Sequence, residues 1–187
     1  EGEEMPVSEP GFLGGDRTNL AMPEPEEALV EAVAATGKPL VVVLMNGSAL
    51  AVNWINQHAN AVLEAWYSGE EGGAAIAEKL SGKKKPAARL TGTFYEDVAQ
   101  LPKFEDYSME DRTYRYFTGK PLYPFGYGLS YTTFSYSDLS VPEASVPAGD
   151  PVNADVTGTN TGMVAGDEVV QLYLNVPPVP GAPRIAL

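Results

Sequence analysis

The sequence contains no cysteine and only one histidine. The lack of cysteine excludes disulfide bonds and thiolate zinc sites, although it does not by itself fix the redox compartment. The lack of a second histidine leaves His58 as the only residue on which a histidine-based catalytic relay could be built. Its surroundings, NWINQHANAVLEAW, are typical of a polar position in a helix or loop. The sequence therefore excludes a thiolate zinc site and does not favour a histidine relay.

Basic residues are also scarce, with 12 lysines and arginines against 25 acidic residues and a formal net charge of −13. A surface of this sign repels both a phosphate backbone and an anionic membrane, so we expect neither nucleic acid nor a membrane as a partner. The one basic run, Lys83–Lys85, follows Gly82 and precedes Pro86, which is typical of a solvated loop. The longest apolar run, around PLVVVLM, is far too short to span a bilayer, and the start EGEEMPV is no signal peptide.

The 187 residues are 44% hydrophobic, enough for one core or one and a half. The segment EPEEALVEAVAATGKP predicts a helix that begins near Pro25, ends at Gly37 and turns Leu29, Val30 and Val33 inward. It leads into LVVVLMNG, a β-branched run typical of a strand covered on both faces. A second strand, AVLEAW, and a helix that closes at Gly82 follow. This order of elements predicts an α/β fold with a mostly parallel sheet.

The second half of the chain has a different texture. Prolines interrupt any long element after Gly82, and from Phe134 onward three strand patterns follow with no helix between them: FSYSDLSV, PVNADVTGTNTG and DEVVQLYLNV. Such a series predicts a β-sandwich, yet three strands fall short of the roughly seven that a sandwich needs. The α/β part is equally short of strands. We therefore expect the sequence to be cut at both ends.

Several distinctive motifs together cover nearly the whole chain: the aromatic segment GKPLYPFGYGLSYTTF, the preceding DRTYRYF and AWYSGEEGG, and the stretches EGEE, GDRTNL, GKPLVVVLMNGSALAVNW and AGDEVVQLYL. These motifs resemble glycoside hydrolase family 3, the β-glucosidase and β-xylosidase family. The resemblance implies that residues 1–117 are the second half of an (α/β)6 sandwich domain. It implies an aromatic inter-domain connector at residues 118–133, and the start of a truncated fibronectin type III-like domain at residues 134–187.

The resemblance also implies where the chemistry lies. In this family the nucleophile is an aspartate on a preceding barrel domain, and the acid/base is a glutamate in a Gly-Glu or Glu-x-Glu context before an Asp-Arg pair. EGEE and Asp16-Arg17 match that pattern, so Glu3 is the acid/base candidate, with Glu1 and Glu4 as weaker alternatives. Clustered carboxylates raise one another's pKa, as a general acid requires. From the sequence alone, an acidic solvated terminus is the simpler interpretation.

The implied protein is a retaining exo-acting β-glycosidase, an O-glycosyl hydrolase that removes terminal β-linked sugars without a cofactor or metal. Its substrate would be an oligosaccharide or an aryl β-glycoside, its domain partner the barrel of the same chain, and its location periplasmic or extracellular. The 187 residues alone are expected to be inactive. The resemblance gives Glu70, Glu71 and Arg112 structural roles. The alternative function is a non-catalytic carbohydrate-associated or interaction module.

Overall fold

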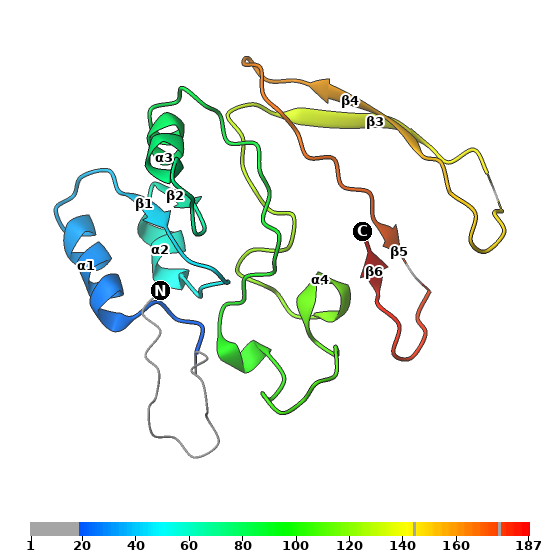
Figure 1. The fold of residues 1–187 in the computed structure, drawn as a ribbon, viewed down its shortest axis with the longest axis horizontal. Coiled ribbons are helices and arrows are strands. Elements are labelled where there is room, and N and C mark those ends of the chain that lie inside the picture. Colours follow the sequence, from blue (N-terminus) through cyan, green and yellow to red (C-terminus); the bar gives the residue numbers. More distant parts are fainter. Residues whose placement is uncertain (1–18, 144, 176) are drawn as a thin grey trace. The chain divides into compact units, whose positions relative to one another are not determined.

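The computed structural model describes residues 19–143, 145–175 and 177–187, and the chain divides into two compact units (Figure 1). One unit, here the α/β unit, contains the described residues up to Ala77, then Leu90–Tyr127 and Gln171–Leu187. The other, here the ribbon unit, contains Glu78–Arg89 and Gly128–Val170. Neither unit is one continuous stretch of chain. The mixture of helices and strands agrees with the predicted α/β class.

Helix α1, Glu24–Ala34, confirms the first predicted helix. Three carboxylates in its first turn face the positive end of the helix dipole, and Gly37 ends it with a left-handed backbone, φ +70°. The prediction that three apolar side chains turn inward is wrong for Leu29 and Val33, which are 65% and 46% exposed. Only Val30 and Ala34, which lie one turn apart on the same face, pack against the core.

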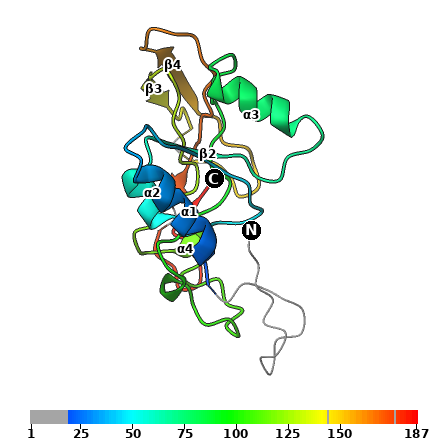
Figure 2. The same cartoon turned by 90° about the vertical axis from the view of Figure 1, so that its left-hand side faces the viewer.

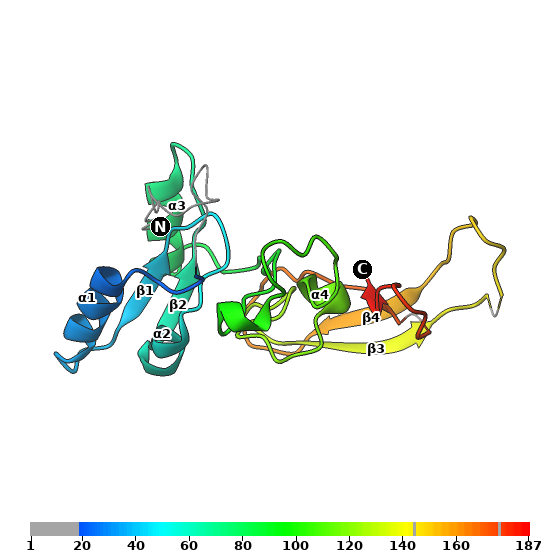
Figure 3. The ribbon, with the colours of Figure 1, turned by 90° about the horizontal axis from the view of Figure 1, so that it is seen from below.

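The core of the α/β unit surrounds a two-stranded parallel sheet. Strand β1, Val41–Leu44, pairs with β2, Ala61–Glu64, and α2, Asn53–His58, connects them (Figure 3). Val42 and Leu44 are buried whereas Val41 is half exposed, so β1 is covered on one face rather than on both as predicted. The core also contains Met22, Leu40, Leu50, Val52 and Ile55.

Residues that follow the parallel sheet in the sequence complete the α/β unit. Backbone hydrogen bonds join Phe94 to Tyr123 in both directions, at 2.9 and 3.1 Å, and the Leu90 N–H donates to the Tyr127 carbonyl at 2.8 Å. Three short elements also belong to this unit: η1, Val98–Gln100, α4, Thr113–Tyr116, and the pair of β5, Leu174–Asn175, with β6, Ile185–Ala186. The second predicted helix, the one expected to close at Gly82, is α3, Gly72–Leu80, followed by Gly82 with φ +74°.

The ribbon unit is built on one antiparallel pair. Strand β3, Phe134–Ser140, runs beside β4, Asp155–Asn160, with a register shift between Ser137 and Ser140 (Figure 2). Among the described residues of this unit only Thr132 is buried. The ribbon unit therefore depends on polar contacts more than on a hydrophobic core.

One expectation for this half of the chain is wrong. Among the described residues of the predicted strand DEVVQLYLNV, only Leu174–Asn175 is paired as a strand, and side chains earlier in the segment make other contacts. The Gln171 amide donates to the Gly126 carbonyl at 3.1 Å, and Glu168 accepts from Arg89 at 2.6 Å. Lys83 and Lys84 are exposed in a loop, as expected of the basic run, and the Lys85 ammonium group donates to the Ala165 carbonyl at 2.8 Å.

Candidate functional site

The predicted catalytic residues Glu3, Glu1 and Glu4, and the pair Asp16-Arg17, lie outside the described residues. The described chain begins at Asn19 and runs beside the segment that follows β1. There the Ala51 N–H donates to the Leu20 carbonyl at 2.7 Å, and Ala21 forms a parallel bridge with Ala51.

The carboxyl ends of β1 and β2 form the best-defined candidate surface. Because the two strands are parallel, both ends lie at the same edge of the sheet, where ligands of open α/β sheets bind. Strand β1 continues into Asn46–Ser48 and β2 into Ala65–Tyr67. We call these two segments the carboxyl-edge loops.

The first carboxyl-edge loop is tightly folded around Asn46, which is only 1% exposed. Its amide nitrogen donates to the Ser48 carbonyl at 2.7 Å, whereas its Oδ1 has no hydrogen-bond partner among the described residues. Gly47 comes next and lies against the ring of Tyr67, so that a Cβ at this position would stand 2.7 Å from Tyr67 Cε2. A glycine is therefore needed for the two loops to approach this closely.

The second carboxyl-edge loop contains a strained residue. Trp66 adopts a left-handed backbone, φ +53°, which costs a residue other than glycine roughly 1–2 kcal/mol. The Glu64 carboxylate accepts the Trp66 N–H at 3.1 Å, and the indole meets Phe94 edge-on at 6.0 Å. These contacts hold the strained turn, and the turn places Tyr67 at the surface with 66% of the residue exposed.

Most of the aromatic segment is packing. Tyr123 stacks on Tyr127 at 5.2 Å and Phe125 stacks on Tyr114 at 4.3 Å. The Tyr123 hydroxyl donates to Asn56 Oδ1 at 2.7 Å, and burial raises the pKa of this tyrosine. These stacked rings and the Tyr123 hydrogen bond therefore contribute to the stability of the α/β unit.

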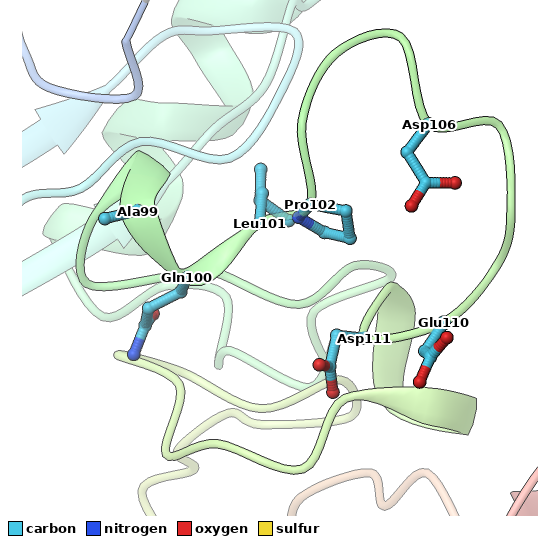
Figure 4. Close-up of a pocket in the computed structure, with 7 residues that line it drawn as sticks. All are labelled: Ala99, Gln100, Leu101, Pro102, Asp106, Glu110 and Asp111. Atoms are coloured by element: carbon cyan, nitrogen blue, oxygen red, sulfur yellow. The ribbon is translucent and has the colours of Figure 1, made fainter.

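A cavity of about 260 Å³ lies in the loop around η1 (Figure 4). Its lining is polar, and Arg112 fixes the loop by donating to the carbonyls of Lys103, Asp106 and Ser108 at 3.3, 2.6 and 3.1 Å. The N–H and hydroxyl of Ser108 lower the pKa of Asp106. This geometry agrees with the structural role expected for Arg112. The cavity is lined by Ala99, Gln100, Leu101, Pro102, Asp106, Glu110 and Asp111.

A second cavity, of about 180 Å³, lies where the described chain begins. The Asn53 side chain beside it donates to the Glu96 carbonyl at 2.7 Å. Across the described ranges, no group of three histidine, cysteine or acidic residues is arranged to hold a metal ion. The residues around the cavity are Asn19, Leu20, Ala21, Glu27, Ala51, Asn53, Glu96, Asp97 and Val98.

The other residues discussed from the sequence have local roles. His58 ends α2, where its Nδ1 lies 2.7 Å from the Trp54 carbonyl and its ring stacks on that indole at 4.1 Å. Glu70 and Glu71 immediately precede α3. None of the helices in the described part of the chain combines the length and apolarity needed to cross a bilayer.

Sequence reasoning missed the carboxyl-edge loops. The signal that would have found them is their position, because Asn46 and Trp66 each come two residues after the last residue of a parallel strand. The strained backbone of Trp66 and the close approach of Gly47 to the Tyr67 ring depend on the three-dimensional fold and cannot be predicted from a local sequence pattern.

Comparisons with known proteins agree with the fold and with these motifs. Residues 1–131 match the model of the glycosyl hydrolase family 3 C-terminal domain. A xylan 1,4-β-xylosidase of Xylanibacter ruminicola is 46% identical over 174 residues, covering 93% of this chain and 20% of the relative. A periplasmic β-glucosidase of Salmonella typhimurium is 44% identical over 84% of this chain and 22% of its own length. The solved β-glucosidase of Bifidobacterium adolescentis has a TM-score of 0.80 and 32% identity over 91% of this chain and 27% of that one.

The match to the family model covers more than half of the chain, and the chain therefore belongs to glycosyl hydrolase family 3. It spans about a fifth of the length of the curated relatives that it matches.

Proposed function

We propose that this chain is the acid/base-carrying part of a retaining exo-acting β-glycosidase that hydrolyses terminal β-linked glucose or xylose. The observation that carries the proposal is the family match over residues 1–131, which includes the acidic segment and both carboxyl-edge loops. Relatives that cover most of the chain are named β-glucosidase or β-xylosidase. These two names define the range of sugars proposed.

The proposed architecture divides the chain between two larger domains, and the boundary differs from that of the two units because β5 and β6 follow Phe134 but belong to the α/β unit. The parallel strands β1 and β2 with their helices are part of an (α/β)6 sandwich, and the antiparallel strands from Phe134 onward are the start of a fibronectin type III-like domain. The parallel pairing supports the first assignment and the antiparallel ribbon supports the second.

In the proposed mechanism, Glu3 protonates the glycosidic oxygen as the bond to the leaving group breaks. An aspartate on a barrel domain of the same parent attacks the anomeric carbon from the opposite face and forms a glycosyl-enzyme, with the two carboxyl groups about 5 to 5.5 Å apart. Glu3 then accepts a proton from the water that releases the sugar.

The test is the substitution Glu3→Gln in the full-length parent. General acid catalysis contributes roughly 10² to 10⁴-fold, so turnover of a disaccharide, whose leaving group is poor, should fall by that factor. Glycosylation by an activated aryl glycoside needs little proton donation and should fall far less. Added azide needs no general base, so it should restore turnover of the activated substrate by capturing the glycosyl-enzyme.

Glu71→Gln is the matched control, because Glu71 is an acidic residue at the start of α3 and has no proposed part in the chemistry. It should leave both substrates unaffected. Equal losses on good and poor leaving groups in Glu3→Gln, with no rescue by azide, would transfer the role to Glu1 or Glu4. A parent without turnover on any β-glycoside would instead support a non-catalytic carbohydrate-associated module.

A further inference from the structure

Tyr67 stands out among the exposed aromatic residues because the surrounding backbone is shaped to present it. It follows the strained Trp66, and its ring lies over Gly47, the one residue type that leaves room for it. The strain at Trp66 is held by two contacts, with the Glu64 carboxylate and with the ring of Phe94. Backbone strain of this kind concentrates at functional sites.

The position of Tyr67 connects it to the proposed chemistry. It lies at the carboxyl edge of the parallel sheet, the edge at which open α/β sheets bind ligands. The acid/base residue of a glycosidase stands beside the glycosidic oxygen, and the proposed function assigns that residue to this chain and the nucleophile to another domain. A substrate at this edge would then meet this chain with its leaving group. The attacking carboxylate approaches the terminal sugar from the opposite face.

We propose that Tyr67 is a specificity-determining residue that stacks against the group on the leaving-group side of the scissile bond. The proposal rests on the proposed function, and the ligand it assigns is a sugar ring or an aryl group. A tyrosine suits this task, because its ring offers a flat apolar face to the C–H groups of a sugar or to an aryl ring. With 66% of the residue exposed, Tyr67 has accessible surface for such a contact while Gly47 supports the ring.

The test measures ligand binding on the leaving-group side of the scissile bond in the full-length parent, separately from the chemistry on the sugar. A 2-deoxy-2-fluoro glycoside with a good leaving group traps the glycosyl-enzyme, and reactivation is then followed with phenyl β-D-thioglucoside as an acceptor that the enzyme does not hydrolyse. The acceptor concentration at half-maximal rate measures binding on the leaving-group side only. Reactivation by water alone measures the chemistry without an acceptor.

Tyr67→Ala should raise the half-maximal acceptor concentration about tenfold, the size expected for one aromatic contact, and leave the water reaction unchanged. Tyr67→Phe keeps the ring and should change the acceptor constant by less than about twofold. Gly47→Ala should weaken acceptor binding in the same direction, because the new Cβ would meet the ring at 2.7 Å and displace it. Tyr107→Ala removes a tyrosine that is 90% exposed on another loop and should have no effect.

The possible failures are distinguishable. An unchanged acceptor constant in Tyr67→Ala, or a water reaction that slows as much as the acceptor reaction, would overturn the role of Tyr67 while the proposed glycosidase stands. A parent that forms no trapped glycosyl-enzyme would overturn the proposed function, and the role of Tyr67 with it.

Discussion

The α/β unit has the shorter main strands, of four residues each against seven and six in the ribbon unit, yet it buries far more apolar side chain. In the α/β unit, alternate residues of β1 enter a core in which Ile55 is fully buried. In the ribbon unit, every residue of β4 is exposed, and so is every residue of β3 except the half-buried Phe134. Backbone hydrogen bonding is thus similar in the two units, whereas the hydrophobic contribution to stability is concentrated in one of them.

This difference in burial indicates different roles for the two units. A rigid, well-packed unit can hold a strained turn such as that at Trp66, because the surrounding contacts offset the strain. A ribbon without a core cannot position catalytic groups with the same precision. We therefore expect the chemistry to depend on the α/β unit, and the ribbon unit to tolerate substitution.

The largest expected effect concerns activity. The 187-residue chain, purified alone, should show no hydrolysis of an aryl β-glucoside that the full-length parent cleaves, because the proposed nucleophile belongs to another domain. The measurement is release of the aryl alcohol over several hours at high protein concentration. Measurable turnover that survives repurification would show that this chain contains both carboxylates.

The next effect concerns the core of the α/β unit. Ile55→Ala should lower the free energy of unfolding by about 2–5 kcal/mol, because it removes fully buried methyl and methylene groups and leaves a cavity. Both tryptophans, Trp54 and Trp66, lie in this unit, so urea unfolding followed by tryptophan fluorescence reports on it.

The control for Ile55 is Leu139→Ala in β3, where the leucine is 65% exposed. It should change the free energy of unfolding by no more than about 0.5 kcal/mol. Similar losses for the two variants would contradict the contrast between the units.

A smaller effect is expected at the ion pair of the ribbon unit. The side chains of Arg89 and Glu168 are 12% and 20% exposed, and the Tyr136 hydroxyl donates to the same carboxylate at 3.0 Å. Arg89→Ala leaves that carboxylate partly buried without its cation, so the ribbon unit should lose about 1–3 kcal/mol. Faster hydrogen exchange at the amides of β3 and β4, with unchanged exchange in β1, would be the signature. Equal acceleration in both units would show that they unfold together.

The smallest effect concerns the Tyr95 hydroxyl, which accepts the Thr113 N–H at 2.9 Å. Tyr95→Phe leaves this N–H without its acceptor and should cost about 1 kcal/mol at neutral pH. Burial raises the pKa of Tyr95, and this outweighs the lowering by the Thr113 N–H and by Arg112. The fold thus favours the neutral phenol over the phenolate, so the stability advantage of the natural protein over Tyr95→Phe is fully present below about pH 10 and decreases as the pH rises through the raised pKa of Tyr95.

The comparison to make is urea unfolding of the two proteins at pH 7 and at pH 10.5. The difference between the natural protein and Tyr95→Phe should shrink at the higher pH. A difference that grows with pH would mean that the pKa of Tyr95 is lowered by folding.

Local chemistry made much of the α/β unit predictable. Local signals predicted three elements of this unit. They are the carboxylates and Gly37 around α1, the β-branched run of β1 and the glycine after α3, each of which acts within a few residues. Burial was less predictable, because the exposure of Leu29 and Val33 depends on which face of α1 meets the core. The unpaired segment before Leu174 depends on whether a neighbouring strand is available.

The residues of the candidate site also differ in whether the sequence could predict them. Glu3 came from a motif and remains a prediction, since it lies outside the described residues. Tyr67 was not predicted, because its interest arises from the strain at Trp66 and from Gly47, which lies twenty residues away in the sequence. Contacts across such a separation follow from the fold and not from a local pattern.

The discontinuity of the α/β unit affects how it can assemble on a ribosome. Its first strand, β1, is synthesised early. Backbone hydrogen bonds of the same unit join Tyr123 to Phe94 and Tyr127 to Leu90. A side-chain hydrogen bond joins Gln171 to Gly126. The larger part of the ribbon unit, Gly128–Val170, is synthesised between Tyr127 and Gln171. The contact between Gln171 and Gly126 therefore forms only after more than forty further residues have been made, and chaperones have that interval in which to bind the incomplete unit.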